Sequence, residues 1–186
     1  GEGKTTTVAN LAITYANMGK KTILVDADLR KPVLHKMFKS TKNTGLTNLL
    51  SNSELDINDL AIDTGVENFK VLTSGIIPPN PSEMLASDKM EILVKKLKKD
   101  FDIILFDTPP LIAVTDAFVI TKFVDKFLLV IRASKTQKGA LERTLVNCNN
   151  MNNTIDGVIF NAVNESNTYG GGYYYNYYQY YYGSDT

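Results

Sequence analysis

The chain has 186 residues, which is enough for one domain with a sizeable hydrophobic core. Its 20 basic and 20 acidic residues give a formal net charge of zero, which argues against nucleic-acid binding through a broad basic face. The single cysteine, Cys148, excludes an internal disulfide framework, and no apolar run has the length of a membrane span. These features favour a cytoplasmic protein.

The first seven residues match the second half of the phosphate-binding loop G-x-x-x-x-G-K-[ST]. In such a loop, backbone N–H groups surround the phosphates, the lysine reaches the β- and γ-phosphates, and the hydroxyl after it holds Mg²⁺. We therefore expect ATP and Mg²⁺ to bind at Gly1, Glu2, Gly3, Lys4, Thr5 and Thr6. Lys4 is also a catalytic candidate. The alternative is a glycine-rich helix start that binds nothing. The strand that feeds such a loop would lie before residue 1.

Hydrophobic periodicity predicts a helix after the loop that ends at Gly19, because apolar residues recur at 8, 11, 12 and 15. Further helices are predicted at 33–38, 46–50, 82–99, 115–124 and 139–150, strands at 21–26, 69–75, 102–107, 126–133 and 155–163, and a polar connection at 51–68. The alternation predicts an α/β fold, a doubly wound and mostly parallel sheet with helices on both faces. Ligands bind such sheets at the carboxyl ends of the strands.

Three aspartates follow predicted strands at this edge. Asp26 and Asp28 end the first strand, and Asp107 ends the run Ile104-Leu105-Phe106. Mg²⁺ prefers hard oxygen ligands, so Asp107 and Asp26, together with Thr5, are candidate metal ligands. Asp26 could also orient an incoming hydroxyl and receive its proton, and Asp28 would support either role. Each aspartate alone could be a solvated strand end, since turns often contain aspartate.

Other polar residues give weaker signals. Arg30 and Lys31 could steady developing phosphate charge or could belong to a solvated turn. His35, the only histidine, has no partner for a triad or metal site, so a structural or surface role is expected. Cys148 lies on an apolar helix face and is expected to be a small buried hydrophobe.

Nine of the ten tyrosines lie near the C-terminus: Tyr169, Tyr173, Tyr174, Tyr175, Tyr177, Tyr178, Tyr180, Tyr181 and Tyr182. This end has no aliphatic residue and a low-complexity composition, so we expect residues 168–186 to be disordered. The folded domain would then span residues 1–167. The alternative for the tail is a sticky linker or a fortuitous compositional bias.

With these motifs together, the chain resembles the bacterial tyrosine kinases of capsular and exopolysaccharide biosynthesis. The resemblance rests on the phosphate loop, the segment Ile23–Pro32, the segment Ile104–Pro110 and the tyrosine cluster. The segment 74–85 is also similar to a stretch of that family. The resemblance covers essentially the whole chain.

The resemblance implies a phosphate-loop NTPase fold of the deviant Walker type and an ATP-dependent kinase that phosphorylates the tyrosines of its own tail. It also implies control of polysaccharide synthesis and export, with a membrane adaptor of the polysaccharide co-polymerase type as activator. Neighbouring subunits would be substrates in trans, and the chain would act at the inner face of the membrane. Asn161 would lie near the adenine.

Two other functions remain open. One is a partition- or division-type ATPase of the same superfamily, which hydrolyses ATP as a switch and phosphorylates no protein. The other is a nucleotide-binding scaffold with an adhesive tyrosine tail and no turnover.

Overall fold

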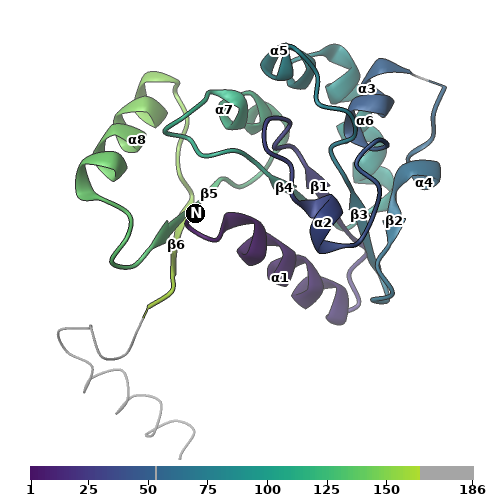
Figure 1. Ribbon diagram of the computed structural model, residues 1–186, viewed down its shortest axis with the longest axis horizontal. Helices are drawn as coiled ribbons and strands as arrows, with labels where there is room; N and C mark the ends of the chain where they lie inside the picture. Colours follow the sequence, from purple (N-terminus) through teal and green to yellow (C-terminus); the bar gives the residue numbers. More distant parts are fainter. Residues whose placement is uncertain (53, 164–186) are drawn as a thin grey trace, which may run out of the picture.

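The computed structural model describes residues 1–52 and 54–163, which form parallel strands alternating with helices (Figure 1). The elements in chain order are α1 (Lys4–Asn17), β1 (Thr22–Asp26), α2 (Leu34–Met37), α3 (Leu46–Ser51), α4 (Ile57–Leu60), β2 (Ile62–Asp63), β3 (Phe69–Leu72), α5 (Pro81–Leu85), α6 (Asp88–Asp100), β4 (Ile103–Asp107), α7 (Asp116–Ile120), the 3₁₀ turn η1 (Thr121–Phe123), β5 (Leu128–Arg132), α8 (Lys138–Asn150) and β6 (Gly157–Asn161). Among these residues, no helix has the length and apolarity needed to cross a membrane.

The strands form two ladders. One has the order β2-β3-β1-β4, with β1 parallel to both β3 and β4, and the other pairs β5 with β6 in parallel. Among the strands of the described residues, only the two-residue strand β2 runs antiparallel, against β3. The predicted mostly parallel α/β sheet is therefore confirmed.

Strand β1 supplies both faces of the core. Ile23 and Val25 pack in one cluster with residues of α3, α6 and α7, whereas Leu24 packs in another with α1 and α2. Successive strand side chains point to opposite faces, and all three of these have no exposed surface. Helices thus cover both faces of the sheet, as the doubly wound fold requires.

The single helix predicted over 82–99 is wrong. The chain forms α5 up to Leu85 and begins α6 at Asp88. Ser87 takes an extended conformation between them and caps α6, because its hydroxyl accepts the Met90 N–H at 3.4 Å. Ser82, the first residue of the predicted helix, donates its hydroxyl to Asp116.

The polar connection predicted over 51–68 also contains regular structure. Asp56 accepts the Asn58 N–H at 2.8 Å and so caps the short helix α4. Strand β2 follows at once and extends the edge of the sheet beyond β3. Polar composition concealed both elements, because each is only two to four residues long.

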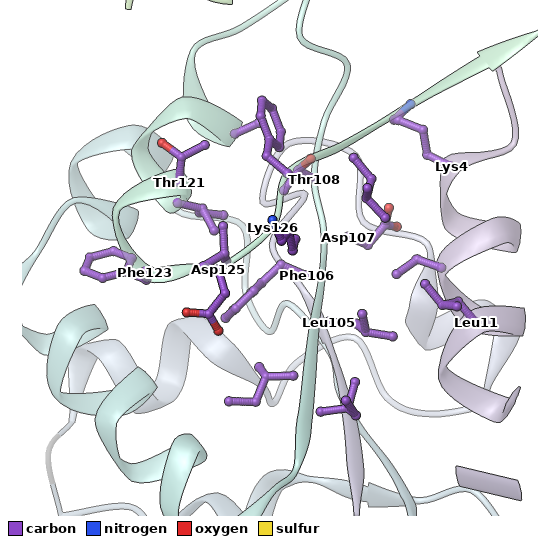
Figure 2. A pocket seen from close by; sticks show the side chains of 18 of the residues that line it. Lys4, Leu11, Leu105, Phe106, Asp107, Thr108, Thr121, Phe123, Asp125 and Lys126 are labelled. Carbon is purple, nitrogen blue, oxygen red and sulfur yellow. The ribbon is translucent and has the colours of Figure 1, made fainter. Parts of the chain in front are cut away.

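A gap separates the two ladders. Within the described residues β4 and β5 do not pair with each other, and an apolar cavity of about 600 Å³ lies between them. Figure 2 shows this cavity, with Lys4, Leu11 and Asp107 on one side and Phe123 and Asp125 on the other. A strand leading into the phosphate loop was expected, and this gap offers one unpaired strand edge on each side.

Candidate active site

Gly3 joins the start of the chain to α1 in the left-handed conformation, with φ of 89°. A Cβ atom at this position would also overlap the side-chain nitrogen of Asn161. The positive φ therefore favours glycine here, and a Cβ atom would also force the end of the Asn161 side chain to shift. In the described part of the chain no side chain caps α1, and its first turn contains no acidic residue. The first N–H groups of α1 are thus available to an anion such as phosphate.

Lys4 begins α1 and lies at the mouth of the cavity. Its Nζ atom is 3.4 Å from the Glu2 carboxylate, so the loop supplies its own counter-ion to the lysine. A phosphate group that reached Lys4 would compete with Glu2 for the same charge. The pair is partly exposed, so the competition costs little.

Thr5 and Asp107, both predicted metal ligands, are in direct contact. The Thr5 hydroxyl donates to Asp107 Oδ2 at 2.5 Å. Asp107 ends β4 and lies opposite Asp26, which ends β1, in the register of the two strands. The loop, the helix start and both carboxylates therefore meet at one edge of the sheet, as predicted.

Both carboxylates are almost completely buried. Burial raises the pKa of Asp26 to about 7, with the hydrogen bond from the Leu34 N–H opposing the shift and the negative charges of Asp107 and Asp28 adding to it. Burial also raises the pKa of Asp107, against the hydrogen bond from Thr5. Both carboxyl groups therefore take up a proton more readily than an exposed aspartate does.

Asp28 shapes the loop that follows β1. Its Oδ1 atom accepts the N–H groups of Arg30 at 3.2 Å and Lys31 at 2.9 Å, and its own N–H donates to Asp26 Oδ1 at 3.3 Å. Asp26 in turn accepts the Leu34 N–H at 3.1 Å through Oδ2. Backbone donors of residues 28–34 thus hold both aspartates in place.

Arg30 neither stands free in solvent nor lies in an unpaired turn. Its Nε donates to Asp116 Oδ2 at 2.7 Å and its Nη2 to Asp116 Oδ1 at 3.0 Å. Ser82 donates to the same carboxylate at 2.6 Å. Sequence reasoning missed Asp116 and the role of Ser82, because an aspartate at the start of a helix is typical of any first turn. No periodicity links Arg30 to a residue 86 positions away.

Asn161 ends β6 beside the phosphate loop. Its Nδ2 donates to the Glu2 carbonyl at 2.9 Å, and its Oδ1 accepts the Ala162 N–H at 2.8 Å. Arg132 lies opposite it at the end of β5 and donates to the Gly1 carbonyl at 3.3 Å. The second ladder therefore braces the loop from the side away from the aspartates.

The other candidate residues differ in their exposure to solvent. Thr6 is exposed on the first turn of α1. His35 and Cys148 are both buried, and the burial of Cys148 was expected. The tyrosine cluster, and with it the predicted boundary between domain and tail, lies outside the described residues.

Comparisons with known proteins agree on one family. The profile of the AAA domain matches residues 1–162. The chain is 46% identical to the tyrosine-protein kinase YwqD of Bacillus subtilis over 140 residues, which are 74% of this chain and 58% of that protein. It is 39% identical to the tyrosine-protein kinase CpsD of Streptococcus agalactiae over 172 residues, 91% of this chain and 74% of CpsD. The chain thus spans less than two thirds of the length of YwqD.

Solved structures of similar proteins share the fold of this chain. The chimerical protein CapA2B2 superposes with a TM-score of 0.81 at 37% identity, over 86% of this chain and 70% of the chimera. The septum site-determining protein MinD of Pyrococcus horikoshii, complexed with Mg-ADP, reaches 0.65 at 25% identity over 86% of this chain and 65% of MinD. The shared fold is that of phosphate-loop nucleotide-binding proteins.

Proposed function

The chain belongs to the family of bacterial tyrosine-protein kinases, and from this premise we propose that it transfers the γ-phosphoryl group of ATP to protein tyrosines. The observation that carries the proposal is the juxtaposition of Asp26 and Asp107 on neighbouring strands, with Thr5 hydrogen-bonded to Asp107 and Lys4 immediately before Thr5 in the chain. Phosphoryl transfer depends on positioning and charge neutralisation, and this edge of the sheet supplies groups for both.

The donor set fits Mg²⁺. The described residues contain no group of three or more His, Cys, Asp or Glu side chains that could hold a metal ion unaided. Mg²⁺ in phosphate-loop enzymes takes only one or two protein ligands and completes its shell with phosphates and water. Thr5 and Asp107 would hold the ion, with Asp26 as a further ligand, and the ion would neutralise phosphate charge.

The residues of the chain then have separate tasks. The N–H groups at the start of α1 and the Lys4 ammonium bind the phosphates and stabilise the charge that develops on them. The tyrosine oxygen forms a bond to the γ-phosphorus as the bond to the bridging oxygen breaks, and ADP leaves with that electron pair. Asp26 orients the phenol and receives its proton late in the transfer.

The environment of Asp26 suits this task better than water would. A free aspartate has a pKa of about 3.9 and a tyrosine about 10, so an exposed aspartate is a poor base for a phenol. In the absence of Mg²⁺, burial raises the pKa of Asp26 to about 7, which narrows this difference. Asp28 supports Asp26 through the loop backbone.

We place the acceptor tyrosines in the C-terminal cluster from Tyr169 to Tyr182. We propose that these tyrosines accept phosphate either in their own active site or in that of a neighbouring subunit. By family membership we further propose regulation of capsular or exopolysaccharide synthesis. We also propose activation by a membrane adaptor of the co-polymerase type and a location at the inner membrane face. Asn161 would contact the adenine as well as the loop.

Incubation with γ-labelled ATP and Mg²⁺ tests the proposal. We expect label on tyrosine in the wild-type chain and none when the nine tail tyrosines are changed to phenylalanine, with the melting temperature unchanged. Label only as free phosphate would indicate a nucleotide switch. This is the second candidate, favoured by the likeness to MinD with Mg-ADP. No turnover at all would leave a binding scaffold.

A further inference from the structure

Three segments that are distant in the sequence meet at the side chain of Asp116. Arg30 comes from the loop after β1, Ser82 from α5 and Asp116 from the start of α7. Helices α5 and α7 lie side by side at the carboxyl end of the sheet (Figure 1). Arg30 Nη2 is also 3.2 Å from the Ser82 hydroxyl, so the three side chains form a closed triangle. We call it the Arg30 fork.

The fork depends on the shape of arginine. Two nitrogens of one guanidinium contact the two oxygens of Asp116, a bidentate geometry that lysine cannot reproduce. Asp116 has no exposed surface, whereas the Arg30 side chain is 41% exposed. Burial alone would raise the pKa of Asp116, but the hydrogen bonds from Arg30 and Ser82 hold it below its usual value. The carboxylate is therefore ionised and fully occupied by these partners.

The same short loop carries the site aspartates. Arg30 is two residues after Asp28, whose carboxylate accepts the Arg30 N–H, and four after Asp26. Asp28 and Asp26 are themselves held by backbone groups of residues 28–34. If Arg30 lost its anchor on α5 and α7, the backbone donors that fix both carboxylates would be free to move.

We propose that Arg30 is a positioning residue. Its hydrogen bonds to Asp116 and Ser82 fix the loop after β1, and this loop in turn orients Asp26 and Asp28 toward the transferred phosphoryl group. The inference rests on the proposed kinase function for its catalytic consequence. Among the described residues Nη1 of Arg30 makes no hydrogen bond, so a direct contact between Arg30 and phosphate is the alternative that the variants must separate from positioning.

The full chain with its tail should be compared with Arg30→Gln, Arg30→Lys, Asp116→Asn and the double variant Arg30→Gln/Asp116→Asn. The control is Lys95→Gln, which breaks an exposed ion pair with Glu91 on α6. The readouts are kcat for phosphotyrosine formation, KM for ATP, the Kd of Mg-ADP by calorimetry, the melting temperature, and hydrogen exchange of residues 27–34.

The positioning role predicts that Arg30→Gln and Asp116→Asn each lower kcat about 100-fold, the loss that a misplacement of about 1 Å can cause. Arg30→Lys should lower kcat about tenfold. The double variant should be no slower than the slower single variant, because both changes remove the same anchor. The Kd of Mg-ADP should stay within about threefold, and loop amides should exchange faster. Lys95→Gln should match wild type in every readout.

Three results would overturn the inference. If Asp116→Asn keeps full kcat while Arg30→Gln loses it, Arg30 acts on the phosphate directly. If kcat stays within about threefold in both, or falls only in step with the melting temperature, the fork is merely structural. If the loop amides of the variants exchange hydrogen at wild-type rates, the fork does not hold the loop, whatever the values of kcat. A wild-type chain that forms no phosphotyrosine but shows fork-dependent loop exchange would instead refute the kinase proposal alone.

Discussion

The two ladders of the sheet differ sharply in how far their apolar side chains are buried. Every residue of β1 is buried, and the core clusters gather around it. Beyond residue 120, Cys148 is the only buried hydrophobic residue among those described. Large apolar side chains are exposed there instead: Leu128, Leu145, Val146, Met151, Val158, Phe160 and Val163.

The difference lies in the neighbours and not in the sequence of the strands. The run Leu128-Leu129-Val130-Ile131 in β5 is as apolar as Ile23-Leu24-Val25 in β1. However, β1 is paired on both edges, whereas β5 pairs only with β6 and faces the cavity beside β4. Strand composition predicts that a segment is extended, but its burial depends on what lies alongside it.

Function divides along the same line. The four-stranded ladder and the loop after β1 carry Asp26, Asp28 and Asp107, and the two-stranded ladder contributes Asn161 and Arg132 to the phosphate loop. We infer that the chemistry belongs to the first ladder and the bracing of the loop to the second.

The largest expected effects come from substitutions of the aspartates that end β1 and β4 in the four-stranded ladder. Asp26→Asn and Asp107→Asn should each lower the rate of tyrosine phosphorylation by several orders of magnitude, since each removes a charge at the reacting phosphate. Asp107→Asn should also weaken the dependence of the rate on Mg²⁺, measured by titration at fixed ATP. If that variant keeps the wild-type Mg²⁺ dependence, Asp107 is not a metal ligand.

A matched pair of leucine substitutions measures the contrast in stability. Leu24→Ala in β1 should lower the free energy of unfolding by about 2–5 kcal/mol, because Leu24 has no exposed surface and its loss leaves a cavity. Leu128→Ala in β5 should cost less than about 1 kcal/mol, since Leu128 is 44% exposed. Urea denaturation gives both values. Equal costs would mean that the second ladder is covered in solution.

The smallest expected effect is a pH dependence of stability without Mg²⁺. Because the pKa of Asp26 is raised to about 7, the folded chain keeps a proton between pH 4 and 7 that the unfolded chain has released. Stability from this group is therefore greatest at low pH and is lost as the pH rises toward 7. In EDTA, the melting temperature of wild type relative to Asp26→Asn should fall by roughly 5 °C between pH 5 and pH 8. Parallel curves for the two proteins would contradict the raised pKa.

Local patterns predicted much of this architecture. The helix after the loop, the buried strand that ends at Asp26 and the meeting of Asp26 with Asp107 all follow from periodicity and from the rule for parallel strands. The contact between Thr5 and Asp107 brings together two residues that the motif predicts to be ligands of one ion.

What could not be predicted depends on contacts between distant residues or on very short elements. The break at Ser87 rests on one capping hydroxyl within an otherwise periodic segment. The Arg30 fork joins three segments that no local pattern connects. The exposure of β5 and β6 depends on which strands pair with them, and strand composition does not encode pairing.

The most direct test of the central claim is the mass of the tail after incubation with Mg²⁺ and ATP, compared between wild type and Lys4→Met. We expect phosphate on several tyrosines between Tyr169 and Tyr182 in wild type and none in Lys4→Met. Both proteins should melt within a few degrees of each other, because the Lys4 side chain pairs only with the partly exposed Glu2 in the part of the chain that the structure describes. Phosphotyrosine in Lys4→Met, or an unmodified tail in a wild-type chain that binds Mg·ATP, would contradict it.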